Sequence, residues 1–450
     1  MAQYKYLMYT MLKYSNCEQL KADNYIKAQK GEAGKVETLT FDFIGGKDVM
    51  PIGGWWGPYQ PKNPVCDLSD IRFYELIKEA GVNFIVVSPD NYQENPQAAL
   101  KGFKNATETG LGMFAHDTKI KEIDNPEELR QRLEEYNHFP CCLGFHLQDE
   151  PAPGAINQLT KYFDVYEQVG IDKPLYVNLY AAGIHEFFGN DGEAQGYAEY
   201  LEEFFETTKP QFLSNDFYPF SFKDEGTNTA KIYFKSLSLT RKHAMMHNVP
   251  YWFFIQAGWW EKGGETDEER WPTKSELFWN VNTCLAYGAK AIQYFTLVQP
   301  EEYTVFHDVI NYRKIGIIGF DGQKNQWYPY VQQINQHIAA IDHVLMNSEH
   351  DGVIGVGKWS ENWLGEEKLA SYKELVGVSG GDAIIGCFNY QGSTALYIVS
   401  NSTTNESTVT LTFDCVRGFE IIDDGKSLEL VGQNPSFVLE AGAGFLLLLK

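Results

Sequence analysis

The stretch Leu143-Gly-Phe-His-Leu-Gln-Asp-Glu150, followed by Pro151, decides how the chain is interpreted. It begins as a short apolar run, ends in two carboxylates and is stopped by a proline. Runs of this length that are rich in aromatic and β-branched residues are typical of buried strands. Seven further runs of this kind flank it, at 49–56, 83–90, 110–117, 174–180, 211–218, 250–256 and 289–296.

Segments with helical spacing fill the gaps between these runs. The clearest begins at Asn125-Pro-Glu-Glu128, where a capping residue precedes a first-turn proline and two acidic residues. The others span 69–81, 93–110, 155–170, 195–208, 229–247, 273–288 and 327–347. Strand–helix alternation repeated eight times predicts an α/β fold, a (β/α)8 TIM barrel over residues 46–347. A doubly wound sheet is the alternative, but the chain has no GxGxxG or Walker A motif.

The pattern changes on both sides of this region. Residues 1–45 form an N-terminal arm, in which Thr38 to Phe43 is expected to be a strand that closes the bottom of the barrel. From residue 348 to 450, short apolar runs separated by Asn, Ser, Gly and Asp turns predict a small antiparallel β-sandwich.

The composition limits the partners. The chain has 450 residues, of which 37 are basic and 60 acidic, so the formal net charge is −23. Nucleic acid and anionic membranes bind through Lys and Arg, so neither is expected as a partner. No apolar run reaches the length of a membrane span, and no signal segment is recognisable. The seven scattered cysteines favour free thiols and a cytoplasmic protein, although an exported form with a trimmed signal is compatible with the sequence.

Polar and aromatic side chains gather at the ends of the predicted strands, where barrel enzymes carry their active sites. Flat aromatic faces stack on sugar rings, while amides, imidazoles and carboxylates bind hydroxyl groups, so this set predicts a carbohydrate substrate. Trp residues occur in two adjacent pairs, Trp55-Trp56 and Trp259-Trp260, and one member of each pair is expected to pack inward. The predicted substrate-binding residues are Trp55, Trp56, His116, His146, Asn178, Tyr180, Tyr218, Gln256, Trp259, Trp260 and Tyr294.

The sharpest motif is Leu147-Gln-Asp-Glu-Pro151. Neighbours in a strand point to opposite sides, so Asp149 and Glu150 should have different roles, one in the cleft and the other facing the loop or the next strand. The motif resembles the end of strand four in the clan of barrel glycoside hydrolases that includes many β-galactosidases and cellulases. The resemblance implies that Glu150 is the acid/base residue; Asp149 stands where that clan usually has Asn. The barrel followed by a sandwich is also similar to members of the clan.

One departure from the clan concerns the second carboxylate. The clan's nucleophile is a Glu that ends strand seven, whereas this strand ends in Gln256. Asp216, at the end of the sixth run, is the alternative catalytic carboxylate, as base or nucleophile, with Asp149 as a further candidate. Strands four and six are not neighbours, which favours a wide carboxyl separation and an inverting reaction.

The sequence therefore predicts a glycoside hydrolase with Glu150 as general acid and without a cofactor. Two other classes stay open: a non-catalytic carbohydrate-binding protein, and a barrel lyase or isomerase with His116 or His146 as base. A metal bound by His116 and Asp117 has no supporting HExxH motif or ligand spacing. The sugar, the linkage and the oligomeric state are left open, and a homo-oligomer is compatible with the sequence.

Overall fold

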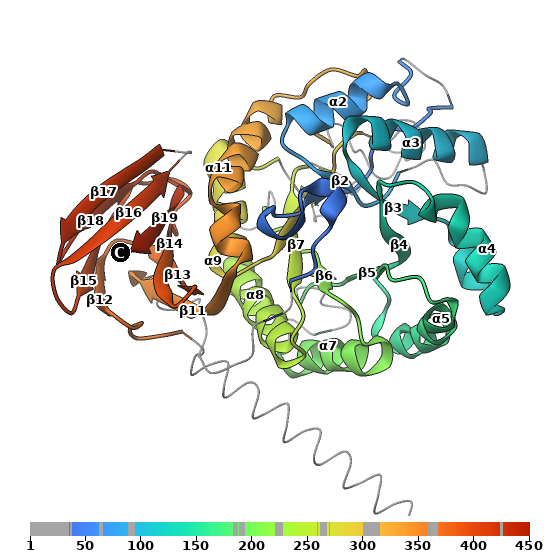
Figure 1. Ribbon diagram of the computed structural model, residues 1–450. Helices are drawn as coiled ribbons and strands as arrows, with labels where there is room; N and C mark the ends of the chain where they lie inside the picture. The colour runs from blue at the N-terminus through green and yellow to red at the C-terminus, as the bar shows by residue number, and fades with distance from the viewer. Residues whose placement is uncertain are drawn as a thin grey trace, which may run out of the picture.

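The computed structural model describes residues 36, 38–62, 66–88, 95–182, 188, 194–220, 228–258, 260–261, 268–269, 271–299, 316–358, 360, 368–423 and 426–450. Figure 1 looks along the axis of a barrel that is surrounded by helices. Its parallel strands are β1 (Ile52–Gly54), β2 (Phe84–Ile85), β3 (Gly112–His116), β4 (Cys142–Asp149), β5 (Leu175–Leu179), β6 (Leu213–Asn215), β7 (Tyr251–Gln256) and β10 (Ala291–Phe295).

The predicted (β/α)8 barrel is confirmed. The strand order is β1-β10-β7-β6-β5-β4-β3-β2, with parallel pairing throughout. The main-chain N–H groups of Asn83 and Val86 donate to Ile52 O and Gly54 O, at 2.8 and 2.9 Å, and so join β2 to β1. The outer helices are α2 (Ile71–Glu79), α3 (Pro96–Thr109), α4 (Pro126–Asn137), α5 (Ile156–Val169), α7 (Ala194–Thr208), α8 (Asn228–Met246), α9 (Lys274–Ala286) and α11 (Tyr328–Met346).

Local sequence signals set several helix ends. The Asn125 side chain accepts hydrogen bonds from the N–H groups of Glu127 and Glu128 and so caps α4, as its sequence predicts. A capping box between Thr273 and Glu276 starts α9. Gly170, with φ of 71°, ends α5 in the left-handed conformation that glycine adopts without strain. These signals fix where a helix begins or ends, and so where the chain turns between a helix and a barrel strand.

Aromatic rings fill the lower half of the barrel. Phe84, Phe114 and Trp252 contact one another edge-on or at a tilt, with ring centroids 5.7–6.4 Å apart. Gly53 makes room for Phe84, because a Cβ atom at this position would lie 2.2 Å from the Phe84 ring. The lower lumen is therefore a packed core, and the polar side chains of the strands gather above it.

The segment before β1 differs from the prediction. Thr38 to Phe43 forms no strand; residues Asp42–Ile44 are a short 3-10 helix, η1. The buried ring of Phe41 instead packs against Phe114 and Trp252, with centroids 6.1 and 6.2 Å apart. The Phe41 side chain therefore closes the bottom of the barrel. The alternating apolar residues of this segment reflect side-chain packing and not the backbone pairing of a strand.

The C-terminal part is the predicted antiparallel sandwich. One sheet has the order β11-β13-β14-β19-β16-β17 and the other the order β12-β15-β18. Three of these strands, β12, β17 and β18, were not predicted; β17 is largely exposed and has no buried face that would mark it. The bounds are β11 (Ser348–Val356), β12 (Leu375–Gly380), β13 (Ala383–Tyr390), β14 (Ser393–Ser400), β15 (Ser407–Phe413), β16 (Arg417–Asp423), β17 (Lys426–Gly432), β18 (Ser436–Leu439) and β19 (Gly444–Leu449).

The sandwich packs against α9 and α11 of the barrel (Figure 1). Trp279 Nε1 of α9 donates to Asn401 Oδ1 at 2.9 Å. Gly386 of β13 approaches the helix so closely that a Cβ atom there would lie 2.3 Å from Ala286 O. Apolar side chains of the six-stranded sheet, such as Tyr397, belong to the same buried cluster as the barrel helices. One face of the six-stranded sheet thus shares a buried cluster with the barrel helices, while the interior of the sandwich forms a separate cluster between its two sheets.

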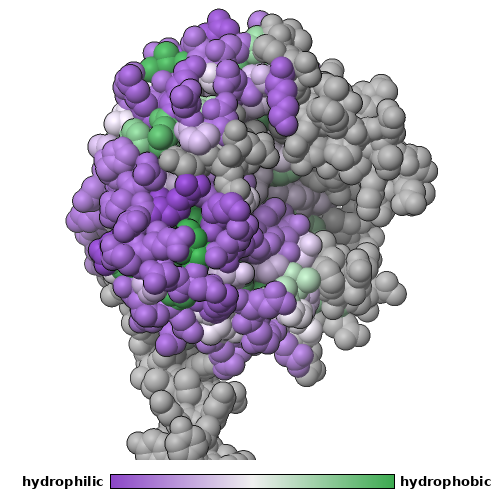
Figure 2. All heavy atoms as spheres, turned by 90° about the vertical axis from the view of Figure 1, so that its right-hand side faces the viewer, coloured by the Kyte–Doolittle hydropathy of each residue, from purple (hydrophilic) through white to green (hydrophobic). Residues whose placement is uncertain are grey.

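The polarity of the surface, the helix lengths and the state of the cysteines complete the description of the fold. The described residues on the face in Figure 2 are mainly hydrophilic, with hydrophobic residues in small separate patches. No helix among the described residues is long and apolar enough to cross a membrane. The cysteines that the structure describes are free thiols, namely Cys66, Cys141, Cys142, Cys284, Cys387 and Cys415.

Candidate active site

The chain leaves β4 through an unusual backbone conformation. Glu150 has φ of 41°, in the left-handed region that non-glycine residues rarely adopt. Its N–H donates to Asn178 O of β5 at 2.9 Å, and the Tyr200 hydroxyl donates to Pro151 O at 2.8 Å. Such strain persists only where the surroundings enforce it, and it concentrates at functional sites. Here it directs the Glu150 side chain towards the end of β6.

Glu150 and Asp216 form a hydrogen-bonded carboxyl pair. Burial and the negative charges of Asp216 and Asp149 raise the pKa of Glu150 to about 10. Burial, opposed by hydrogen bonds from Glu150 and Tyr218, raises the pKa of Asp216 to about 7. At neutral pH the pair therefore holds one proton on Glu150, while Asp216 is partly ionised.

Asp149 is a third carboxylate at the same opening. Its side chain is exposed, yet enough protein surrounds it for burial to raise its pKa to about 6. Asn178 Nδ2 donates to Asp149 Oδ1 at 3.3 Å, and the ammonium group of Lys121 favours the ionised form. Asp149 thus turns towards the next strand while Glu150 faces Asp216, which are the separate orientations that the alternation of the strand predicts.

Lys121 is a site residue that the sequence analysis missed. It lies on a 3-10 helix, η3 (Thr118–Glu122), which follows β3, and its half-buried ammonium group donates to Gln148 Oε1. Burial lowers the pKa of Lys121, and the charge of Asp149 acts in the opposite direction. A single Lys in a polar connection has no periodicity that would mark it in the sequence.

The hydrogen bond between the two carboxyls bears on the expected separation. A wide gap between Glu150 and Asp216 was predicted because β4 and β6 are not neighbours. The left-handed turn at Glu150 brings the side chains into direct hydrogen-bonding contact instead. Inverting enzymes keep their carboxyls ~6.5–9.5 Å apart to hold a water molecule, whereas retaining enzymes keep them ~5–5.5 Å apart. A contacting pair lies on the retaining side of this division.

An aromatic wall stands beside the carboxyl pair. Phe295 of β10 lies 5.4 Å from Trp56 and 5.4 Å from Tyr218 between ring centroids. Tyr218 also hydrogen-bonds to Asp216. Trp56 is half-buried, whereas Trp55 is buried and packs edge-on against His146 at 5.1 Å. One member of the doublet therefore packs inward, as predicted.

The placement of Tyr294 on this wall is wrong by one residue. Its hydroxyl donates to Asn335 Oδ1 of α11 at 2.8 Å, so the side chain points out of the barrel into the helix layer. Its neighbour Phe295 points to the opposite side, because successive residues of a strand alternate. Tyr294 carries the polar hydroxyl group that suggested a ligand contact, but Phe295 is the member of the pair that faces the lumen.

Two histidines lie beside one another in the lumen. The rings of His116 and His146 are in register on β3 and β4, with centroids 5.3 Å apart. Burial lowers the pKa of both, so both are neutral at pH 7. Among the described residues, His116 Nδ1 and His146 Nε2 are buried atoms without a hydrogen-bond partner. Neutral imidazoles of this kind can bind hydroxyl groups of a ligand.

A polar network orders the lumen beneath Asp149. Tyr176 donates to Gln293 Oε1 at 2.6 Å and lies 2.8 Å from Ser214 Oγ. Ser214 in turn donates to Asn178 Oδ1 at 3.0 Å. Asn178 can therefore direct its amide protons to Asp149. Asn178 was predicted to bind substrate; in the structure its amide hydrogen-bonds to the Asp149 carboxylate.

Gln256 has a structural partner. Its Oε1 accepts from the N–H of Phe220 at 2.8 Å, and its Nε2 donates to Phe220 O at 2.9 Å. The side chain is fully buried. Gln256 thus holds the segment that follows Asp216 and Tyr218, and its amide is occupied by main-chain groups.

The other predicted residues lie at the edge of the site or beyond the description. The N–H of Tyr180, which is half-buried, donates to the Tyr200 hydroxyl at 3.4 Å. Trp259 lies outside the described residues. Trp260, whose side chain is not described, begins β8 (Trp260–Glu261), which pairs antiparallel with β9 (Glu268–Glu269). Asp117 caps η3 and pairs with Arg132 at 2.5 Å. No group of three His, Cys, Asp or Glu side chains within the described ranges is arranged to hold a metal ion.

Comparisons with known proteins identify the fold. No protein-family model and no curated protein sequence matches the chain. Among solved structures, a β-galactosidase from Bacillus circulans sp. alkalophilus is similar with a TM-score of 0.56, 9% identity and coverage of 89% of this chain and 99% of that one. A GH42 β-galactosidase from G. stearothermophilus gives 0.54, 9%, 92% and 100%.

The fold is shared with enzymes that act on different sugars. A GH27 β-L-arabinopyranosidase from Geobacillus stearothermophilus, solved in complex with arabinose, gives a TM-score of 0.51 with 10% identity and coverage of 90% of this chain and 97% of that one. The chain therefore has the barrel-and-sandwich architecture of glycoside hydrolases, which confirms the resemblance at the level of fold. Identities of this size select no activity, so the function has to be argued from the site.

Proposed function

We propose that the chain is a glycoside hydrolase with Glu150 as general acid and Asp216 as the second catalytic carboxylate. The observation that carries the proposal is the hydrogen-bonded carboxyl pair at the ends of β4 and β6. Glycoside hydrolysis requires one protonated and one ionised carboxyl near neutral pH. The raised pKa of Glu150, about 10, and that of Asp216, about 7, supply this division of roles.

The short separation favours a retaining double displacement. Asp216 attacks the anomeric carbon while the bond to the leaving oxygen breaks and the Glu150 proton passes to that oxygen. Glu150, now ionised, takes a proton from water, whose oxygen attacks the anomeric carbon and releases Asp216. The second step restores the proton on Glu150 and leaves the product with its original anomeric configuration.

The substrate class follows from the walls of the site. Trp56, Phe295 and Tyr218 offer aromatic faces, and the orphaned ring nitrogens of His116 and His146 can bind hydroxyl groups. The acidic net charge and the cluster of carboxyls favour a neutral glycoside over an anionic one. The proposed substrates are therefore neutral oligosaccharides or small glycosides, with no cofactor.

The first experiment is a screen of aryl and natural glycosides, followed by Glu150→Gln. Loss of the general acid should slow hydrolysis of a natural glycoside by ~10²–10⁴-fold. An aryl glycoside with an acidic leaving group needs little protonation and should lose much less. Glu135→Gln, an exposed carboxylate of α4, serves as the matched control and should leave both rates unchanged.

Two outcomes would contradict this proposal. Turnover of the natural glycoside by Glu150→Gln at the wild-type rate would remove Glu150 from the reaction. Binding of glycosides without turnover of any would instead identify a non-catalytic carbohydrate-binding protein, the alternative that the missing strand-seven carboxylate supports.

We also infer a reducing compartment, as in the cytoplasm. The described cysteines are free, and burial raises the pKa of Cys141, Cys142 and Cys284, so these thiols are chemically inert. Titration of the denatured, non-reduced protein should detect all 7 cysteines as thiols. A count of one would mean three disulfides and an exported protein.

A further inference from the structure

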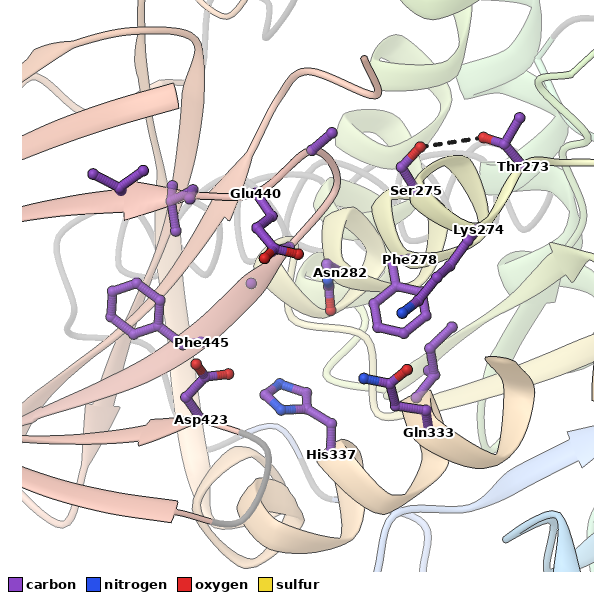
Figure 3. A pocket seen from close by; sticks show the side chains of 16 residues that line it. Thr273, Lys274, Ser275, Phe278, Asn282, Gln333, His337, Asp423, Glu440 and Phe445 are labelled. Atoms are coloured by element: carbon purple, nitrogen blue, oxygen red, sulfur yellow. Dashed lines mark hydrogen bonds between the residues drawn. The ribbon is translucent and has the colours of Figure 1, made fainter. Parts of the chain in front are cut away.

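A cavity lies at the junction of the barrel and the sandwich, and we name it the seam cavity (Figure 3). Its volume is about 640 Å³, within the range of roughly 300–1,000 Å³ that is usual for small-molecule sites. Helices α9 and α11 form one side, and β16, β18 and β19 form the other. It shares no lining residue with the carboxyl pair. The side chains that matter for its chemistry are Phe278, Gln333, His337, Asp423, Glu440 and Phe445.

Hydrogen bonds across the junction hold the walls in place. The Tyr397 hydroxyl donates to Asn282 Oδ1 at 2.7 Å, and Asn282 Nδ2 donates to Gly442 O at 2.8 Å. Because the hydroxyl proton of Tyr397 is used, its oxygen accepts from His337 Nε2, 3.0 Å away. This fixes both the orientation and the tautomer of the His337 ring. The cavity is therefore preformed, which lowers the entropy cost of binding a ligand.

The polar groups of the cavity combine acceptors and donors. Figure 3 shows the carboxylates of Glu440 and Asp423 on the sandwich side, turned towards the same space as Gln333 and His337 of α11. The ammonium group of Lys274 lies 5.2 Å from the centre of the Phe278 ring at the barrel side. A ligand that both donates and accepts hydrogen bonds through many small groups matches this mixture better than an ion of either sign.

Two phenyl rings line the cavity, and Phe445 is the more deeply buried of the two. Phe278 comes from α9 on the barrel side and Phe445 from β19 on the sandwich side, as Figure 3 shows. Phe278 is half-buried, so part of its ring remains open to the cavity. Sugar rings combine hydroxyl groups, which donate and accept, with C–H faces, which pack on aromatic rings.

We propose that the seam cavity is a second, non-catalytic saccharide site that binds one or two neutral sugar rings. The carboxylates of Asp423 and Glu440 accept from hydroxyl groups, Gln333 and Lys274 donate to them, and Phe278 packs on a ring face. Because the walls come from both units, a bound saccharide bridges the barrel and the sandwich. The proposal depends on the chemistry of this cavity and not on the activity of the carboxyl pair.

The test uses the full chain and three neutral disaccharides, lactose, cellobiose and maltose, as probes. Each protein carries Glu150→Gln so that the probes are not consumed, and binding is measured by calorimetric titration. Asp423→Asn with Glu440→Gln should weaken the seam site about tenfold or more, because hydroxyl groups lose charged acceptors. Glu406→Gln, an exposed carboxylate of the sandwich away from the cavity, is the matched control and should leave binding unchanged.

A second variant separates loss of binding from loss of structure. Phe278→Leu keeps an apolar side chain but removes the flat face, and should weaken the same probe several-fold at an unchanged melting temperature. In the otherwise wild-type chain, none of these seam variants should change kcat on an aryl glycoside. No binding of any probe, or equal binding in the seam variants and the control, would overturn the proposal. A failed glycoside screen would not, because it concerns only the carboxyl pair.

Discussion

Two strands of the barrel end in contrasting ways. Strand β4 ends in a strained turn that carries Asp149 and Glu150 towards other carboxylates, at a cost in solvation. Strand β7 ends in Gln256, which is fully buried and satisfied by the main chain of Phe220. Both residues lie at the carboxyl end of a barrel strand. Of these two ends, β4 carries carboxyl groups with raised pKa values, whereas β7 carries an uncharged amide. The contrast supports the proposal that the second catalytic carboxylate is Asp216 at the β6 end and not a residue of strand seven.

The largest expected effect is that of Asp216→Asn. If Asp216 is the second catalytic carboxylate, hydrolysis should fall by at least ~10²–10⁴-fold. The wild-type rate should rise as Asp216 ionises near pH 7 and fall as Glu150 loses its proton near pH 10. In the variant, the lower limb should vanish and the upper limb should move to lower pH, because Glu150 no longer faces a carboxylate.

The measurement is the pH profile of residual activity with an activated aryl glycoside. Azide should rescue Asp216→Gly and yield a glycosyl azide of configuration opposite to the substrate, as expected for loss of a nucleophile. Products with inverted anomeric configuration from the wild type would contradict the retaining scheme. Undiminished activity of Asp216→Asn would remove Asp216 and leave Asp149 to be tested.

The next effect is on stability, at the other strand end. Gln256→Glu restores the residue type expected at the end of strand seven, but an ionised carboxylate cannot donate to Phe220 O. We expect a loss of about 2–4 kcal/mol in the free energy of unfolding and no gain in activity. Burial raises the pKa of the introduced carboxyl in the folded state, so the loss should grow as the pH rises through that pKa.

Urea denaturation at pH 5 and pH 8 tests this expectation. Gln256→Met, of similar size and without charge, should be destabilised equally at both pH values and serves as the control. A Gln256→Glu protein that is as stable as the wild type and more active would reverse the comparison, because strand seven would then be a catalytic position.

The smallest effect is that of Asp149→Asn. Removing its charge should lower the pKa of Glu150 and move the alkaline limb of the pH profile down by about one unit. The maximal rate should change only a few-fold, since Asp149 donates no proton and attacks no atom in the proposed scheme. An unchanged alkaline limb would show that Asp149 does not act on Glu150, and a loss as large as that of Asp216→Asn would make it a catalytic residue.

The barrel could be predicted because the signals for each strand–helix repeat lie close together in the sequence. A buried strand, a capped helix and a glycine stop, as at Asn125 and Gly170, are visible without knowledge of the partners. The sequence also placed Glu150 and Asp216 at strand ends. It could not predict their contact, since the left-handed backbone of Glu150 depends on neighbours from β5 and α7. Lys121 could not be found at all, because it is defined only by the fold around it.

Alternation explains the mistake at the last barrel strand. Tyr294 and Phe295 are adjacent aromatic residues, and a shift of one residue exchanges the lumen for the helix layer. Composition favours Tyr as the sugar-binding residue, but the register of β10 on β7 places Phe295 beside Gln256 and Tyr294 beside Ile255. Residue type therefore pointed to Tyr294, whereas the register of β10 shows that Phe295 is the residue that faces the lumen.

The shared core between the barrel and the sandwich has a consequence for how the protein folds. Tyr397 of the sandwich and Trp279 of the barrel are buried in one apolar cluster and hydrogen-bonded across the junction. Neither unit can lose its packing without exposing the other, so the chain should behave as a single cooperative unit with one calorimetric transition. The sandwich then contributes to the stability of the barrel, and a truncation at residue 347 would leave α9 and α11 with an exposed, aggregation-prone face.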